Sequence, residues 1–140
     1  AKLSRSAVEA YERDGYCFPI QVLSEAEALK FRQRLEASEA AGTAPDGALR
    51  SKSHLLFTWV DELVRHPAVL DAVESVIGPN ILVWGANFFL KEPKSDAYVS
   101  WHQDATYWGL EPSDIVTAWV ALSPSTVESG CTFMTDPSLY

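Results

Sequence analysis

A histidine and an aspartate stand two positions apart in the segment Ser100-Trp101-His102-Gln103-Asp104. Side chains at i and i+2 of an extended strand emerge on the same face, so both side chains could reach one ion. One imidazole nitrogen and one carboxylate oxygen form part of the two-histidine, one-carboxylate facial triad of mononuclear iron sites, whose second histidine must come from elsewhere. A His-x-Asp triplet alone is a weak signal, because it occurs by chance and is often only a hydrogen-bonded pair.

The residues that follow the triplet give a longer pattern. The stretch WHQDATYWGLEPSDIVTAWVALSPSTVESGC begins at Trp101 and contains His-Gln-Asp, a tyrosine, a proline-containing loop, Trp-x-Ala-Leu and an acidic residue before Ser-Gly-Cys. This pattern resembles the signature of the phytanoyl-CoA dioxygenase family. Upstream, Gly78-Pro79-Asn80 is similar to the family's entry to its first core strand. The chain is therefore identified, by resemblance, as the front portion of an Fe(II), 2-oxoglutarate-dependent oxygenase.

The resemblance also implies roles for individual residues. His102 and Asp104 match the iron ligands. Four further residues match positions beside the cosubstrate in relatives, two of them through a looser alignment upstream: Gln103, Trp119, Lys52 and Asn87. Core packing is the alternative for Trp119, and a solvated surface position is the alternative for Lys52.

The implied enzyme is a dioxygenase that hydroxylates a small organic molecule, with Fe(II) as cofactor and 2-oxoglutarate and O2 as cosubstrates. In this family's reaction 2-oxoglutarate is decarboxylated to succinate. Related halogenases carry Ala or Gly where this chain has Asp104, so the carboxylate favours hydroxylation. The substrate itself is left open, because aromatic residues near the motif suit a core as well as a binding wall.

The family resemblance covers only part of a complete family member, since single all-β domains of this kind run to about 200 to 250 residues. The second iron histidine and an arginine for the far carboxylate of 2-oxoglutarate are expected beyond Tyr140. His54 and His66 both precede the His-x-Asp pair, and His66, directly before Pro67, is more typical of a helix cap.

Several interpretations stay open at this point. The chain could be a truncated or incompletely recorded family member, it could be completed by a second copy or a separate polypeptide, or it could be a non-catalytic remnant that acts as a binding or assembly module. A cupin-like isomerase or hydrolase is disfavoured, because such proteins present clustered histidines. A half-built barrel would expose strand edges and apolar surface, so a homo-oligomer is a direct expectation.

Helical signals dominate residues 1–79. Ser4 is a candidate N-cap for a helix that Gly15 ends. Ser24 and Glu27 form an S-x-x-E capping box that predicts the start of a second helix, followed by a loop from residue 40 to 47. A third helix is predicted to begin near Pro67 and to end at Gly78-Pro79.

From residue 80 onward the chain becomes β-prone. Strands are predicted over residues 81–84, 87–90, 99–104, 115–122 and 131–134, with an earlier short run at 16–20. Helices followed by strands indicate an α+β or mainly β fold. The resemblance implies a double-stranded β-helix (jelly-roll, cupin-like) core with N-terminal helices packed outside, here incomplete. We expect one domain, 1–140, with a helical front region (1–79) and the first core strands (80–140).

Composition limits the other possibilities. The 140 residues are 47% hydrophobic, which suits one globular domain with a real core, and the net charge of -8 argues against nucleic-acid binding. No apolar run is long enough for a membrane span, and the first residues lack a secretory signal, so a cytoplasmic location is expected. Cys17 and Cys131 are expected to be ordinary buried thiols.

Overall fold

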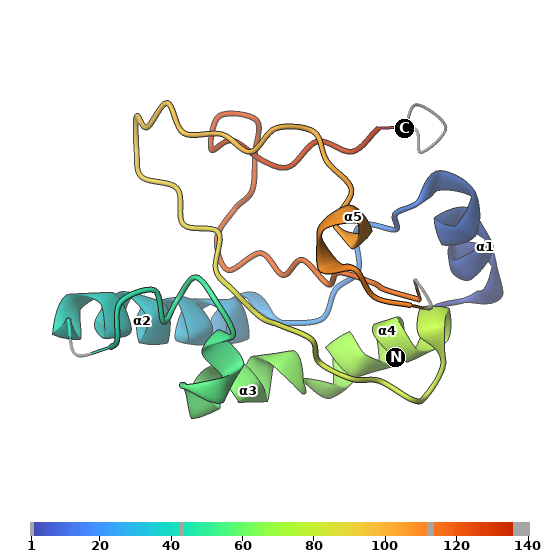
Figure 1. Cartoon of the computed structure of the whole chain (residues 1–140), viewed down its shortest axis with the longest axis horizontal. Coiled ribbons are helices and arrows are strands. Elements are labelled where there is room, and N and C mark those ends of the chain that lie inside the picture. Colours follow the sequence, from blue (N-terminus) through green and yellow to red (C-terminus); the bar gives the residue numbers. More distant parts are fainter. Residues whose placement is uncertain (1, 43, 112–113, 136–140) are drawn as a thin grey trace.

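The computed structural model describes residues 2–42, 44–111 and 114–135. Its elements, in chain order, are α1 (Arg5–Asp14), α2 (Glu25–Ala41), the 3-10 helix η1 (Ser53–Leu55), α3 (Thr58–Val64), α4 (Pro67–Ile77) and α5 (Ala105–Trp108). Helices α2, α3 and α4 line one side of the molecule and α1 lies at one end (Figure 1). Residues 80–111 and 114–135 form long loops around α5 on the other side (Figure 1). The end of the predicted core region, 136–140, lies outside the described residues.

Helices α1 and α2 begin at the caps that the sequence predicts. The Ser4 side chain accepts a hydrogen bond from the Ala7 N–H, and α1 ends at Gly15 in the left-handed conformation with φ 79°. At α2 the Ser24 hydroxyl accepts from the Glu27 N–H at 3.3 Å, and the Glu27 carboxylate accepts from the Ser24 N–H at 2.8 Å. The predicted capping box is therefore confirmed.

Helix α4 also starts and ends as predicted, with Pro67 in its first turn and Gly78 after its last residue. His66 caps it, because its Nδ1 accepts from the Ala68 N–H at 3.3 Å. Helix α2 runs on to Ala41, so the predicted start of the following loop at residue 40 is wrong by two residues. The sequence did not predict η1, α3 or α5, and no side chain caps α3 at its N-cap residue Phe57.

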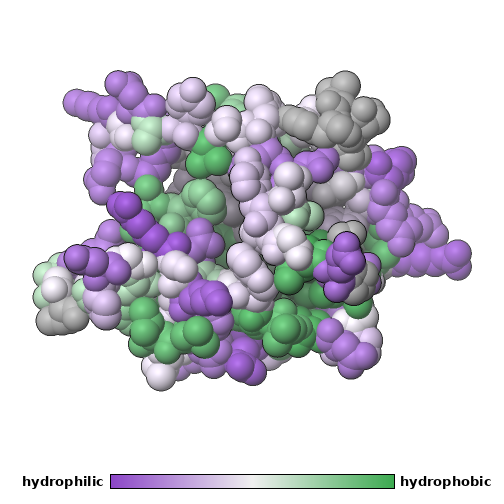
Figure 2. Space-filling model, in the orientation of Figure 1, coloured by the Kyte–Doolittle hydropathy of each residue, from purple (hydrophilic) through white to green (hydrophobic). Residues whose placement is uncertain are grey.

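The core lies among the helices. The buried apolar side chains in the described part of the chain belong to α2, α3, α4 and the loop before η1, and they are Leu35, Ala48, Val60, Leu63, Val69 and Ala72. By contrast, no described residue from 80 to 135 is buried. Hydrophobic residues also gather on the outer surface over α3 and α4 (Figure 2). The helical side thus holds the packed interior, and the loops cover it from one side.

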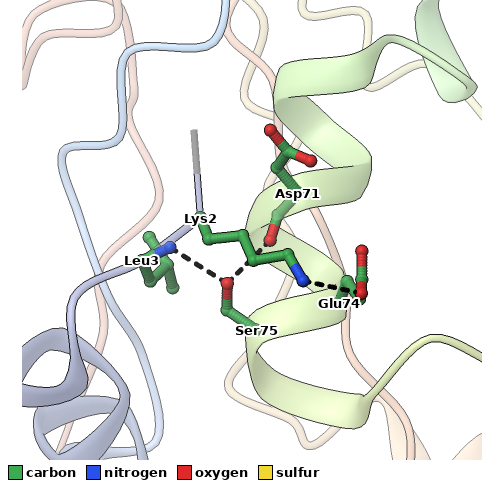
Figure 3. Close-up of polar contacts among 5 residues, drawn as sticks. All are labelled: Lys2, Leu3, Asp71, Glu74 and Ser75. Carbon is green, nitrogen blue, oxygen red and sulfur yellow. Dashed lines mark hydrogen bonds and ion pairs between the residues drawn. The ribbon is translucent and has the colours of Figure 1, made fainter.

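The start of the chain is fastened to α4 (Figure 3). The Leu3 N–H donates to the Ser75 hydroxyl at 2.9 Å, and the same hydroxyl donates to the Asp71 carbonyl oxygen at 2.7 Å. Beside it the Lys2 ammonium pairs with the Glu74 carboxylate at 2.8 Å. One serine hydroxyl therefore joins the segment before α1 to the last turn of α4.

No β-strand is assigned within the described ranges, although residues 80–135 contain most of the runs predicted as strands. A strand is defined by hydrogen bonds to a neighbour, and the bonds present here go to a loop. The Ser53 N–H donates to the Ala86 carbonyl oxygen at 2.9 Å, and the Phe88 N–H donates to the Leu49 carbonyl oxygen at 2.9 Å. The jelly-roll core stays a prediction.

No helix in the described part of the chain combines the length and the apolar character that crossing a membrane demands.

Candidate metal centre

The side chains of His102 and Asp104 point at each other. His102 Nε2 lies 3.1 Å from Asp104 Oδ1, and the two side chains are 32% and 39% exposed. Asp104 is the N-cap residue of α5, with helical backbone angles φ -56° and ψ -45°. The extended backbone predicted at this residue is therefore wrong. The two groups meet because a helical turn begins at the aspartate, and not through the alternation of a strand.

The other ring nitrogen of His102 contacts the backbone. Nδ1 lies 2.8 Å from the carbonyl oxygen of Ser100. Because a carbonyl oxygen only accepts hydrogen bonds, Nδ1 carries a hydrogen, and Nε2 is the ring nitrogen that faces Asp104. Metal-bound histidines commonly donate their second ring N–H to a backbone carbonyl, as this ring does.

A hydroxyl holds the second oxygen of the same carboxylate. Thr117 Oγ1 donates to Asp104 Oδ2 at 2.6 Å, a length typical of a hydroxyl bound to an ionised carboxylate. On the other side, the Tyr107 ring meets the His102 ring edge-on, with centroids 6.0 Å apart. The pair is thus supported by the first turn of α5 and by a segment more distant in the sequence.

The iron that the resemblance implies needs nitrogen and oxygen ligands. The His102 ring nitrogen and the Asp104 carboxylate oxygen that face each other are of the types that fill two positions of an iron facial triad. In the described part of the chain, no group of three or more His, Cys, Asp and Glu side chains could hold a metal. His54 and His66 therefore do not complete such a group: His66 caps α4, and His54 Nδ1 is buried. The described residues thus supply one histidine and one carboxylate of the two-histidine, one-carboxylate triad.

Lys52 and Asn87, predicted to lie beside the cosubstrate, occupy neighbouring segments. The two backbone hydrogen bonds between residues 49–53 and 86–88 flank both residues. Lys52 adopts the left-handed conformation with φ 49°, which is uncommon for a residue with a Cβ. Its ammonium lies 6.0 Å from the centroid of the Trp84 ring. Each of the two side chains is exposed, so each is free to meet a ligand.

A tryptophan pair connects that region to the His102 and Asp104 turn. The rings of Trp84 and Trp108 stack with centroids 4.8 Å apart, and Trp108 is the last residue of α5. Lys52 lies beside Trp84, and α5, which ends at Trp108, starts directly after Asp104. The stack therefore links the segment near Lys52 to the turn that carries Asp104. The Lys52 ammonium, the two tryptophans and the turn that begins at Asp104 therefore lie in one region.

The remaining predicted residues lie close by in sequence. Gln103 is exposed, and its carbonyl oxygen accepts from the Thr106 N–H at 3.2 Å. Trp119 is 52% exposed, so core packing does not account for its ring in the described structure. It follows Thr117 by two positions, and the threonine reaches Asp104.

Sequence reasoning missed Thr117, Ser100 and the tryptophan pair. Only a partial signal existed for Thr117: residues two apart in an extended segment share a side, and Trp119 had been placed near the cosubstrate, but the contact with Asp104 depends on the fold. No comparable sequence signal existed for Trp84 and Trp108, which are paired only by the tertiary fold.

Comparisons with known proteins relate the chain to a probable dioxygenase and a hydroxylase. The chain is 31% identical over 77 residues to a protein of Stutzerimonas stutzeri described as a probable alpha-ketoglutarate-dependent hypophosphite dioxygenase, covering 55% of the chain and 27% of that protein. It is 28% identical over 132 residues to the L-proline trans-4-hydroxylase of Streptomyces griseoviridis, covering 86% of the chain and 49% of that enzyme. The chain thus spans at most about half the length of these relatives. No solved structure matches it.

The family profile gives the broadest match. The profile of phytanoyl-CoA dioxygenase (PhyH) covers residues 11–136, which include α2, α3, α4 and the whole His102 to Thr117 region. Because this match extends over most of the sequence, the chain belongs to the phytanoyl-CoA dioxygenase family.

Proposed function

We propose that this chain provides part of the active site of an Fe(II)/2-oxoglutarate-dependent dioxygenase that hydroxylates a small organic molecule. The observation that carries the proposal is the His102 Nε2 to Asp104 Oδ1 approach of 3.1 Å, with Nδ1 bound to a backbone carbonyl. The relatives named above, a probable dioxygenase and a proline hydroxylase, support the same class of reaction.

In this proposal His102 and Asp104 hold the iron, which supplies the activation of dioxygen when it is bound. Ser100 keeps the proton on Nδ1 and so leaves Nε2 free to bind metal. Lys52 offers a positive charge to an anionic cosubstrate in a chain whose net charge is -8. Three further side chains are proposed to line the 2-oxoglutarate site with it, namely Gln103, Asn87 and Trp119.

The third metal ligand and the arginine for the far carboxylate of 2-oxoglutarate would come from a part of the fold beyond the described residues. We further propose that a second copy of the chain covers the exposed apolar side chains of residues 80–135, which include Leu82, 88% exposed, and Tyr98, 84% exposed. The jelly-roll architecture of that region and a cytoplasmic location belong to the same proposal.

Anaerobic addition of Fe(II) and 2-oxoglutarate tests the proposal. A weak visible charge-transfer band is expected, and succinate should form when air and a substrate are supplied. His102→Ala should abolish the band, because it removes the free ring nitrogen. His66→Asn is the matched control, since it also removes a histidine but keeps a side-chain acceptor at the N-cap of α4.

A second candidate function is a non-catalytic binding or assembly module. One observation favours it: the described residues include no group of three or more His, Cys, Asp or Glu side chains that could hold a metal. Metal analysis separates the two functions. A purified chain that takes up no stoichiometric iron, nickel or zinc, and that gives no band with Fe(II) and 2-oxoglutarate, would leave the binding module as the function.

A further inference from the structure

We propose that Thr117 is a positioning residue that orients the Asp104 carboxylate for metal binding, an inference that rests on the proposed function. Thr117 Oγ1 donates to Asp104 Oδ2 at 2.6 Å, whereas Asp104 Oδ1 faces His102 Nε2 at 3.1 Å. The two oxygens of one carboxylate therefore have separate partners. One oxygen is held by the protein, and the other is presented to the candidate metal position.

Without a partner, the carboxylate would not be fixed. The terminal torsion of an aspartate is broad and roughly two-fold, so its rotamer does not decide which oxygen faces the histidine. The Asp104 side chain is 39% exposed, and neighbouring atoms therefore enclose it only in part. A short bond to one oxygen removes this rotational freedom before a metal arrives, which lowers the entropic cost of binding.

Threonine suits this task better than other residues with a similar shape. Its branched Cβ restricts the first side-chain torsion, so the hydroxyl is held in one direction. Valine has the same shape without a donor, and serine has the donor without the branching methyl group. Thr117→Val therefore removes the hydroxyl and keeps the branched shape, whereas Thr117→Ser keeps the hydroxyl and removes the methyl group.

The bond also connects two distant segments. Thr117 lies 13 residues after Asp104, beyond α5 and the loop that follows it. The chain after that loop runs back beside α5 (Figure 1). The orientation of the carboxylate thus depends on where this returning segment lies, and not only on the first turn of α5.

A held Oδ2 restricts how the carboxylate can bind a metal. With Oδ2 engaged by the hydroxyl, Oδ1 remains as the single oxygen directed at the metal position, which keeps coordination sites open for a cosubstrate. Removal of the hydroxyl would free both oxygens. Partners of a ligating carboxylate typically contribute about 10- to 100-fold to metal affinity.

Cobalt(II) is a suitable probe, because it replaces Fe(II) in air and its visible bands report the ligands. Cobalt(II) would be titrated into the whole chain in four forms: wild type, Thr117→Val, Thr117→Ser and His102→Ala. We expect binding to the wild type, loss in His102→Ala, about 10- to 100-fold weaker binding in Thr117→Val, and near wild-type affinity in Thr117→Ser. The saturated Thr117→Val spectrum should also change, because both oxygens can then coordinate.

The outcomes separate the two proposals. Equal affinity and identical spectra for wild type and Thr117→Val would overturn the role of Thr117 and leave the metal site standing. A wild type that binds no cobalt(II), or a His102→Ala variant that binds it equally well, would overturn the metal site and this inference together. Thr117 is exposed, so its variants should keep the helical circular dichroism. Thr117→Ala provides a second donor-free variant if valine disturbs the fold.

Discussion

The indole rings of Trp84 and Trp108 stack with their centroids 4.8 Å apart. The stack joins the segment after α4 to the turn that carries Asp104. Stacked indoles couple their electronic transitions, so the wild type should show an exciton couplet in the far-ultraviolet circular dichroism. Trp84→Leu and Trp108→Leu should each remove it, and the pair should stabilise the fold by about 1 kcal/mol in a double-mutant cycle. Trp59→Leu is the control, because Trp59 contacts Phe57 and Phe88 instead. A couplet that survives in Trp108→Leu would show that the two rings are apart.

The capping box of α2 predicts a pH dependence of stability. Hydrogen bonds from the Ser24 hydroxyl and then from its backbone N–H lower the pKa of Glu27 below its ordinary value of 4.5. A lowered pKa in the folded state means that the stabilisation is present above pH 4.5 and is lost as the pH falls through the lowered value. Glu27→Gln keeps an acceptor for the capping box but carries no charge, so the free energy of unfolding of this variant should depend less on pH below 4.5. Glu25→Gln is the control, because it removes a first-turn carboxylate outside the capping box and leaves the bonds between Ser24 and Glu27 in place.

Ser75 should be measurably important for the order of the first residues. Ser75→Ala removes the acceptor of the Leu3 N–H, and a hydrogen bond of this kind contributes about 1 kcal/mol. We expect faster hydrogen exchange at the Leu3 amide. Ser38→Ala is the matched control, because Ser38 makes the same bond to a carbonyl four residues earlier in a helix, at 2.8 Å to Arg34, without holding another segment. Unchanged exchange at Leu3 in Ser75→Ala would contradict the tether.

Ser53 presents the opposite case, in which removal of a hydroxyl should stabilise the protein. Its side chain is 0% exposed, and its Oγ has no hydrogen-bond partner among the described residues. Burial of an unpaired hydroxyl costs about 1 to 3 kcal/mol, so Ser53→Ala should raise the free energy of unfolding. The backbone bond to Ala86 is unaffected by this change. Ser53→Val should lower stability by overpacking, and a loss of stability in Ser53→Ala would indicate a bound water at Oγ.

Exposed apolar side chains predict self-association. Leu82 and Tyr98 are 88% and 84% exposed, and neither is covered by the described part of the chain. We expect sedimentation coefficients that rise with concentration in the micromolar range. The double variant Leu82→Glu, Tyr98→Glu should weaken the association with no change in helical circular dichroism. Monomeric sedimentation without concentration dependence would contradict the proposal of a second copy.

The sequence predicted those elements whose signals are local. Ser4, the Ser24 and Glu27 box, and Pro67 each mark a helix start through bonds within one turn, and all three helices begin there. Helix α3 has no such cap, and its β-branched and aromatic residues are poor helix formers. It is held by burial of Val60 and Leu63, which depends on the tertiary fold.

At the candidate site, too, the local features were predicted and the contacts that depend on the tertiary fold were not. His102 and Asp104 were predicted from a motif, because their spacing and neighbours are visible in the sequence. The bond from Thr117 to Asp104 was not predicted, since it joins segments that only the fold brings together. The backbone at Asp104 was predicted wrongly, because the β-prone run before it does not reveal that a helical turn begins there.

The buried apolar side chains of the described residues all precede His102 and Asp104, so substitutions before and after residue 80 should differ in their effect on the helices. Substitutions at Val60 or Leu63 should disturb the packing on which the helices depend. Substitutions at exposed positions after residue 80 should change the stability of those helices little. Sequence drift could therefore reshape the surroundings of His102 and Asp104 while the helical support persists. A library randomised after residue 80 should retain its helical content far more often than one randomised in α3.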